Sequence, residues 1–174
     1  MILFLIVIAI LAAPFIIEWR RIPMDAQARA DAPGEFAELS NGITHYQFHG
    51  PVDGPLVVCV HGLTTPSFVY EGLAKRLVER GHRVLVYDHY GRGYSDRPKG
   101  DQDRAFFVSH LEELLEHLNI DTTFDLVGYS MGGWVVTAYA AMHPKMIKRL
   151  FLLAPAGMGH ELGWTAKLVR DVPI

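Results

Sequence analysis

A serine stands between two glycines in residues 128–132, whose sequence is GYSMG. The mostly apolar residues 124–127 before it predict a buried strand, and the residues after it predict a helix. A turn between the two is so sharp that Ser130 must take a strained backbone, and side chains at Gly128 and Gly132 would collide with the neighbouring strand and helix. This nucleophile-elbow pattern holds a serine hydroxyl out above a sheet edge. We therefore predict Ser130 as a nucleophile and the two glycines as the elbow that holds it.

A second polar segment, HGLT at residues 61–64, directly follows the apolar run 56–60. In an open parallel sheet, ligands bind beyond the carboxyl ends of the strands, so this loop is expected beside the serine. Attack on an acyl carbon leaves negative charge on the former carbonyl oxygen, which preorganised backbone N–H groups stabilise. We expect Met131, at a helix N-terminus, to supply one N–H of this oxyanion hole. Leu63 is expected to supply the other, with Thr64 as the alternative.

Two further groups of polar residues are interpreted as structural. His61 precedes the serine in the chain, and we expect it to shape its loop rather than to act as a base. Residues 88–98 (DHYGRGYSDRP) contain a Gly-x-Gly step, but Asp96 occupies the third glycine position of a dinucleotide fingerprint, and the chain has no Gly-Lys-Ser/Thr phosphate loop. Asp88 and Ser95 are expected to hydrogen-bond the turn.

The spacing of histidine and cysteine completes neither a metal site nor a disulfide. His45 and His49 alternate on one predicted strand face, but no carboxylate or cysteine stands at ligand spacing. Cys59 is the only cysteine, and its position in the middle of a strand predicts an inert core thiol. The net charge of -3 provides no basic field for a phosphate backbone, which argues against nucleic acid as the main partner. We therefore predict no metal and no other cofactor.

Side chains next to the serine are candidates to contact a small acyl substrate. Tyr129, directly before the serine, is a candidate substrate-binding residue, and Met158 is a candidate lining residue of an acyl pocket. Trp134 is interpreted as ordinary packing of the helix that follows the elbow.

Strands and helices alternate along residues 36–157. Apolar runs at consecutive positions predict strands that are buried on both faces, and amphipathic segments between them predict helices. This alternation implies right-handed parallel crossovers and therefore an α/β fold with a doubly wound, mostly parallel sheet. An Asn-Gly turn at 41–42 joins the first two strands into an antiparallel hairpin. The predicted strands are 36–39, 43–48, 56–60, 84–87, 124–127 and 150–154, and the predicted helices cover 69–77, 107–118 and 134–139.

Three of these segments together resemble the α/β-hydrolase fold family: the His-Gly loop at 61–62, the Asp-x-x-Gly-x-Gly-x-Ser loop at 88–95 and Gly-x-Ser-x-Gly-Gly at 128–133. The resemblance covers about residues 36–159 and implies a serine hydrolase acting on ester-type acyl substrates through an acyl-enzyme. Carboxylesterases, lipases, thioesterases, cofactor-free perhydrolases and carbon–carbon bond hydrolases remain open. Serine at the elbow disfavours the dehalogenase and epoxide hydrolase branches, which use aspartate there.

The resemblance is incomplete after the elbow. In this family the triad runs serine, acid, histidine, with the last two on loops after later strands, whereas only 44 residues follow Ser130 here. Neither downstream histidine, His143 or His160, has the family's position. Without a base, a serine hydroxyl is a weak nucleophile. We therefore expect a truncated hydrolase with an incomplete sheet, in which residues 158–174 begin the lid.

Three other interpretations stay open. A naturally short protein could take its base from His160 or from another subunit. A membrane-tethered binding module could keep the fold and the pocket but lack catalysis. A fragment could pair its open sheet edge with a second chain. The oligomeric state is not predicted.

The first 19 residues are predicted to be a transmembrane anchor. Residues 1–17 carry no charged or polar side chain, and as a helix they span about 25 Å, the short end of what crosses a bilayer. The arginines at 20–21 follow this run, which favours an uncleaved anchor with the domain on the cytoplasmic side over a cleaved signal or a buried core helix. Residues 20–35 are predicted to be a linker, and residues 36–157 the hydrolase core.

Overall fold

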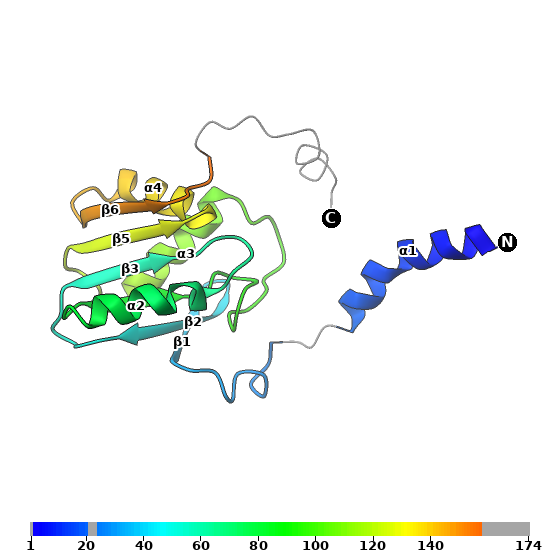
Figure 1. Ribbon diagram of the computed structural model, residues 1–174, viewed down its shortest axis with the longest axis horizontal. Helices are drawn as coiled ribbons and strands as arrows, with labels where there is room; N and C mark the ends of the chain where they lie inside the picture. The colour runs from blue at the N-terminus through cyan, green and yellow to red at the C-terminus, as the bar shows by residue number, and fades with distance from the viewer. Residues whose placement is uncertain (1, 21–23, 158–174) are drawn as a thin grey trace. The chain divides into compact units, whose positions relative to one another are not determined.

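The chain forms two compact units, Met1–Ala32 and Pro33–Ile174. A computed structural model describes residues 2–20 and 24–157 (Figure 1). The first unit contains helix α1 (Ile2–Trp19), and the second contains the sheet and the other helices. The lid start predicted at 158–174, with Met158 and His160, lies outside the described residues.

Helix α1 is the segment that was predicted to cross a membrane. It has 18 residues and, at 1.5 Å per residue, a length of about 27 Å. Within the described part of the chain, no helix combines the length and the apolarity that a membrane crossing requires. The prediction of a transmembrane anchor at residues 1–19 is therefore wrong, and so is the single-pass membrane location with a cytoplasmic domain that rested on it.

The sheet of the second unit is mixed and mostly parallel. Within the described residues it has six strands in the order β1-β2-β4-β3-β5-β6. Strand β2 pairs antiparallel with β1, as the Asn-Gly hairpin predicted, and also with β4. Strand β3 pairs parallel with β4 and β5, and β5 pairs parallel with β6. The prediction of a doubly wound, mostly parallel α/β sheet is confirmed. The strands are β1 (Glu35–Leu39), β2 (Gly42–His49), β3 (Leu56–Val60), β4 (Arg83–Tyr87), β5 (Phe124–Tyr129) and β6 (Ile147–Leu153).

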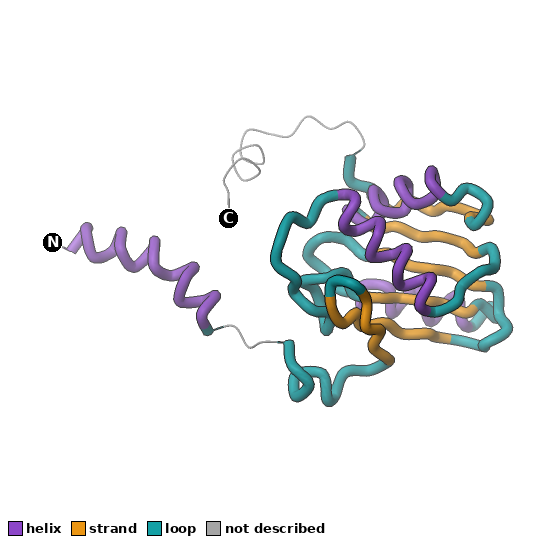
Figure 2. The backbone as a smooth tube through the Cα atoms, turned by 180° about the vertical axis from the view of Figure 1, so that it is seen from behind, coloured by secondary structure: helices purple, strands orange, loops and turns teal. Residues whose placement is uncertain are grey.

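Helices cover both faces of this sheet. The 3-10 turn η1 (Ser67–Tyr70) and helix α2 (Glu71–Val78) lie on one face, and helices α3 (Arg104–His117) and α4 (Met131–Met142) lie on the other (Figures 1 and 2). Consecutive strand residues point to opposite faces, so each central strand serves both layers. In β3, Val57 and Cys59 pack on the α2 side, and Val58 and Val60 pack on the side of α3 and α4. Strand β3 is therefore apolar at every position because both of its faces are buried.

Strand β6 is the exception among the apolar strands. Within residues 24–157 it pairs with β5 alone, and its side chains Leu150, Phe151, Leu152 and Leu153 are 37–43% exposed. An edge strand of this kind has unpaired backbone groups along one side, where a sheet can be extended. Its burial therefore differs sharply from that of β5, although both strands are apolar.

This difference predicts unequal effects of one substitution on two neighbouring strands. Leu126→Ala in β5 removes a side chain that is 0% exposed and should lower the free energy of unfolding by about 2–5 kcal/mol. Leu152→Ala in β6, where the side chain is 37% exposed, should lower it by only about 1 kcal/mol. Urea unfolding of both variants at one pH checks this. Equal losses would show that β6 is covered in solution.

Candidate active site

Ser130 occupies the step between strand β5 and helix α4. Strand β5 ends at Tyr129, and α4 begins at Met131, so the serine is the single connecting residue. Its backbone has φ 51° and ψ −117°, a combination that is sterically unfavourable for a residue with a Cβ. The Ser130 N–H donates to the Leu153 carbonyl, and the Ser130 carbonyl accepts from the N–H groups of Gly133 and Ala156. These backbone hydrogen bonds hold the strained conformation in place.

The glycines of the elbow let the helix approach the sheet. A Cβ at Gly128 would lie 2.6 Å from the Gly132 carbonyl oxygen and 2.7 Å from the Gly133 Cα. A Cβ at Gly132 would overlap the carbonyl oxygen of Val60 on the neighbouring strand. Any side chain at these positions would therefore push α4 away from β5 and β3. This is the physical reason for the glycines that the motif predicted.

The loop at residues 61–64 lies directly beside the serine. A Cβ at Gly62 would be 3.0 Å from the Ser130 Cβ. His61 is fully buried, with its Nε2 2.8 Å from the His89 N–H and its Nδ1 2.6 Å from the Gly62 carbonyl oxygen. Because a backbone N–H only donates, Nε2 is the acceptor, and Nδ1 carries the proton that it donates to Gly62. Burial lowers the pKa of His61 to about 4. Both ring nitrogens are engaged, so His61 shapes the loop and is not available as a base.

The hydrogen bond from His61 to the Gly62 carbonyl also orients the peptide group between Gly62 and Leu63. The carbonyl group of Gly62 and the N–H of Leu63 belong to one trans peptide, in which they point in opposite directions. With the carbonyl held toward His61, the Leu63 N–H points away from the imidazole. Met131 is the first residue of α4, and its N–H has no acceptor one turn earlier in the helix.

A buried ion pair anchors the neighbouring loop, residues 88–96. The Asp88 carboxylate accepts from His45 Nδ1 at 2.8 Å and from the N–H groups of Ser67 and Tyr94 at 2.8 and 3.0 Å. The other ring nitrogen of His45 lies 2.5 Å from the Pro33 carbonyl oxygen. Both of these acceptors lack a proton, so His45 must donate from both nitrogens, which makes it an imidazolium ion.

Burial and ion pairing compete in setting the ionisation of this pair. Burial by itself would lower the pKa of His45, but the Asp88 carboxylate and the Pro33 carbonyl outweigh it, and the pKa is raised. Burial by itself would raise the pKa of Asp88, but the hydrogen bonds from His45, Ser67 and Tyr94 outweigh it, and the pKa is lowered. The Ser95 hydroxyl donates to the Asp88 carbonyl and accepts from the His45 N–H. Asp88 and Ser95 therefore hydrogen-bond the turn, in agreement with their sequence interpretation.

Two more buried histidines complete this layer. His89 Nε2 lies 3.2 Å from the His61 carbonyl oxygen. His110, on α3, lies 2.7 Å from the Thr44 hydroxyl and stacks on the Tyr90 ring with 3.8 Å between centroids. Burial lowers the pKa of His110 to about 3 and that of His89 well below its ordinary value. All of these rings are therefore neutral above the acidic range, unlike His45.

The candidate oxyanion residues border one cavity. It has a volume of about 360 Å³, and Leu63 and Met131 both line it. Trp134 also lines it, although the sequence indicated only packing for this residue. Tyr129 does not line this cavity, and its side chain packs against the core cluster on the α2 side instead. The lining residues are Leu63, Arg92, Gln102, Phe107, Met131, Trp134, Ala156 and Gly157.

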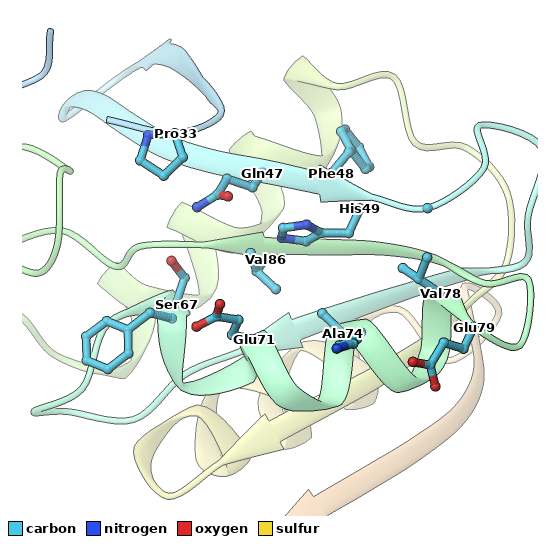
Figure 3. A pocket seen from close by; sticks show the side chains of 13 residues that line it. Pro33, Gln47, Phe48, His49, Ser67, Glu71, Ala74, Val78, Glu79 and Val86 are labelled. Atoms are coloured by element: carbon cyan, nitrogen blue, oxygen red, sulfur yellow. The ribbon is translucent and has the colours of Figure 1, made fainter. Parts of the chain in front are cut away.

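A larger cavity lies on the other side of the sheet. It has a volume of about 830 Å³ and is bordered by β2 and by η1 and α2, with Gln47 and His49 facing Glu71 and Ala74 across it (Figure 3). No residue of the serine elbow or of loop 61–64 lines it. The cavity next to Leu63 and Met131 is therefore the better candidate for the site, despite its smaller volume.

Ser130 lacks a base among the described residues. Within residues 24–157, no side chain forms a hydrogen bond with its hydroxyl. His143 stacks on Tyr139 at the far end of α4, about 20 Å along the helix from the serine, so it cannot take the proton. His160 lies outside the described residues.

Residues 55–172 match the model of the alpha/beta hydrolase fold family. The chain belongs to the α/β-hydrolase family. The resemblance seen in the three sequence motifs is confirmed, and the mixed sheet with Ser130 between β5 and α4 is the α/β-hydrolase core.

Named α/β-hydrolases resemble this chain over part of their length. It is 38% identical over 121 residues to the cis-3-alkyl-4-alkyloxetan-2-one decarboxylase of Shewanella oneidensis, which covers 68% of this chain and 37% of that protein. A hydrolase from Pseudomonas aeruginosa superposes with a TM-score of 0.70 and 28% identity, over 80% of this chain and 51% of that one. An esterase from Exiguobacterium antarcticum superposes with a TM-score of 0.67 and 27% identity, over 76% of this chain and 49% of that one. The chain thus spans about half the length of the solved relatives that it matches.

Sequence reasoning missed several residues that shape this α/β-hydrolase site. His45 was considered only as a metal ligand, but it is the partner of Asp88. His89 and His110 were assigned no role, and Arg92 and Gln102 were not recognised as lining residues. The signal that was available is the density of histidines in otherwise apolar surroundings, because a buried imidazole must find hydrogen-bond partners.

The buried histidines predict a stability that falls in acid. His110 titrates near 6.5 in the unfolded chain but at about 3 in the folded one, so below pH 6.5 the unfolded chain binds a proton that the folded chain does not. The free energy of unfolding should therefore fall by about 1.4 kcal/mol per pH unit from this residue alone. Urea unfolding at pH 7 and pH 5 should show a smaller fall in His110→Gln. His117→Gln, on the exposed face of the same helix, is the control, and an unchanged fall in His110→Gln would contradict the prediction.

Alanine is expected to have opposite effects on stability at two glycines, Gly132 of the elbow and Gly72 of helix α2. Gly132→Ala forces a Cβ into the Val60 carbonyl and should lower the free energy of unfolding by about 3 kcal/mol. Gly72→Ala, at a helical position with no atom within 4 Å of the new Cβ, should raise it by up to about 1 kcal/mol. Thermal unfolding compares the two. A tolerated alanine at 132 would show that α4 does not lie as close to β3 as described.

Proposed function

We propose that Ser130 is the nucleophile of a serine hydrolase that acts on ester-type acyl substrates through an acyl-enzyme. The observation that carries this proposal is the strained Ser130 backbone at φ 51°, held between two glycines that have no room for a side chain. Such strain persists only where the surrounding structure enforces it, and it serves to expose a serine hydroxyl at the carboxyl end of the sheet. The esterase and hydrolase among the solved relatives support the reaction class.

The reaction would proceed in two steps. The Ser130 hydroxyl oxygen attacks the acyl carbon, its proton passes to a base, and the carbonyl π electrons move to the oxygen. The tetrahedral intermediate collapses, the C–O bond to the alcohol breaks, and the alcohol leaves with the proton. Water then attacks the acyl-enzyme in the same manner and releases the acid and free Ser130. The base must come from outside the described residues, because no histidine within them reaches Ser130.

Two backbone amides are suited to the oxyanion. The Leu63 N–H points away from His61, because the Gly62 carbonyl is held by that ring. The Met131 N–H begins α4, where the helix dipole adds positive potential. Both residues line the 360 Å³ cavity. Removal of one such donor in other hydrolases costs about 3 kcal/mol of transition-state stabilisation.

The alternative is a binding module with the same fold and no catalysis. The unpartnered Ser130 hydroxyl in the described part of the chain favours this alternative. The decarboxylase named above also shows that proteins resembling this chain are not all assigned to ester hydrolysis.

The proposal predicts covalent labelling of Ser130 by a fluorophosphonate. The full chain should gain one adduct, located at Ser130 by mass spectrometry of its peptides. Ser130→Ala should remove the adduct, and Ser109→Ala, which changes an exposed serine on α3, should not. A chain that folds but shows no adduct would favour the binding module. An adduct that persists in Ser130→Ala would assign the nucleophile to another residue.

A further inference from the structure

The cavity beside Ser130 contains one charge and no counter-charge. Of its described lining residues, Arg92 alone is ionisable, and no aspartate or glutamate lines the cavity. The rest of the lining is mostly apolar and includes Phe107, Trp134 and Leu63. A cavity of about 360 Å³ is near the lower limit for small-molecule sites, which favours a compact ligand.

The hydrogen bonds of Arg92 all go to neutral oxygens. Its Nε donates to the Leu63 carbonyl at 2.9 Å, and its Nη1 donates to the Tyr90 carbonyl at 2.8 Å and to Gln102 Oε1 at 2.7 Å. A guanidinium has five N–H groups, and these three contacts account for those of Nε and Nη1. The Nη2 amino group has no partner among the described residues.

No carboxylate in the described part of the chain forms an ion pair with Arg92. Partial burial lowers its pKa, and no acidic group opposes this effect. A second cation lies close by, because the Arg104 guanidinium is 5.0 Å from the ring centre of Trp134, which lines the cavity. Within the described residues, the cavity therefore contains a partly desolvated cation that no lining carboxylate neutralises.

We propose that Arg92 binds a carboxylate group of the substrate, so that the substrate class is a compact ester that carries a carboxylate. This inference rests on the proposed function, because it places the ester carbonyl at Ser130 and the carboxylate in the adjoining cavity. Arg92 links the positions proposed for the carboxylate and the ester, because its Nε also donates to the carbonyl of Leu63 in the candidate oxyanion loop.

Guanidinium groups suit this role for two reasons. Their hydrogen bonds to carboxylates are charge-assisted and stronger than those to neutral acceptors. Three existing hydrogen bonds already fix the Arg92 side chain, so little conformational entropy is lost when a carboxylate binds. The methylene groups between the carboxylate and the ester would lie against Phe107 and Trp134.

The opposing interpretation is that Arg92 only connects its own loop to the loop of Leu63. In that case its charge would be irrelevant to ligand choice, and a neutral ligand of the same shape would bind equally well. A matched pair of ligands distinguishes the two interpretations.

The test measures binding without turnover, using the full chain with Ser130→Ala. Monomethyl glutarate carries one ester and one carboxylate, and dimethyl glutarate replaces the carboxylate by a second ester. Calorimetric titration should show monomethyl glutarate binding at least about tenfold more tightly. Equal affinity, tighter binding of the diester, or no binding of either probe would overturn the proposal.

Two variants identify the residue responsible. Arg92→Gln should abolish the preference, and Gln102→Glu should also reduce it, because it supplies a counter-charge 2.7 Å from Nη1 in a side chain that is exposed. Gln102→Glu keeps the hydrogen bond, so it tests the charge even if Arg92→Gln fails to fold. Arg76→Gln, in an exposed ion pair on α2, should keep the full preference. A preference that survives both Arg92→Gln and Gln102→Glu would overturn the proposal.

This test and the labelling of Ser130 fail independently. Labelling without a carboxylate preference would support the hydrolase and overturn the assignment of Arg92. A carboxylate preference without labelling would support the assignment of Arg92 in a binding module.

Discussion

The close approach of helix α4 to strands β5 and β3 is the constraint on which the candidate site depends. The backbone of α4 lies so near both strands that Gly128 and Gly132 have no room for a Cβ. The chain must therefore turn within one residue, and Ser130 takes a positive φ that a longer turn would avoid. The same approach places the first N–H of α4 at the carboxyl end of the sheet. The strained backbone of Ser130, the position of its hydroxyl and the free N–H of Met131 thus all follow from the close packing of α4 on the sheet.

Buried imidazoles hold the loops that face this elbow. His61 directs the amide of Leu63 through the Gly62 carbonyl, and it accepts the N–H of His89 in turn. His45 and Asp88 form an ion pair that connects β2 to the loop containing Arg92. The His61 ring is neutral because it accepts a backbone N–H, whereas the His45 ring is charged because it lies between two acceptors. The geometry of the site therefore depends on protonation states that differ between neighbouring histidines.

Charge differs between the two largest of the described cavities. The larger cavity, between β2 and α2, contains both acidic and basic side chains, Glu71, Lys75 and Glu79. Among the described residues that line the smaller cavity, Arg92 is the one charged side chain, and the cavity adjoins the candidate oxyanion amides. Volume alone would have selected the larger one. The position next to Leu63 and Met131 and the charge of Arg92 make the smaller cavity the candidate on which the proposed function rests.

Local pattern by itself determined the strands, the parallel crossovers and the elbow. Apolar runs indicate strands that are buried on both faces. The Gly-x-Ser-x-Gly spacing indicates a turn of five residues in which the two glycine positions have no room for a side chain. The apolar run at the N-terminus was misread as a membrane anchor, because no helix in the described part of the chain combines the length and the apolarity that a crossing requires. Tertiary structure alone decided which histidine meets Asp88, that Trp134 lines the cavity, and that Arg92 has no carboxylate partner among the described residues. These are contacts between residues far apart in the chain, and their formation depends on how helices pack across the sheet.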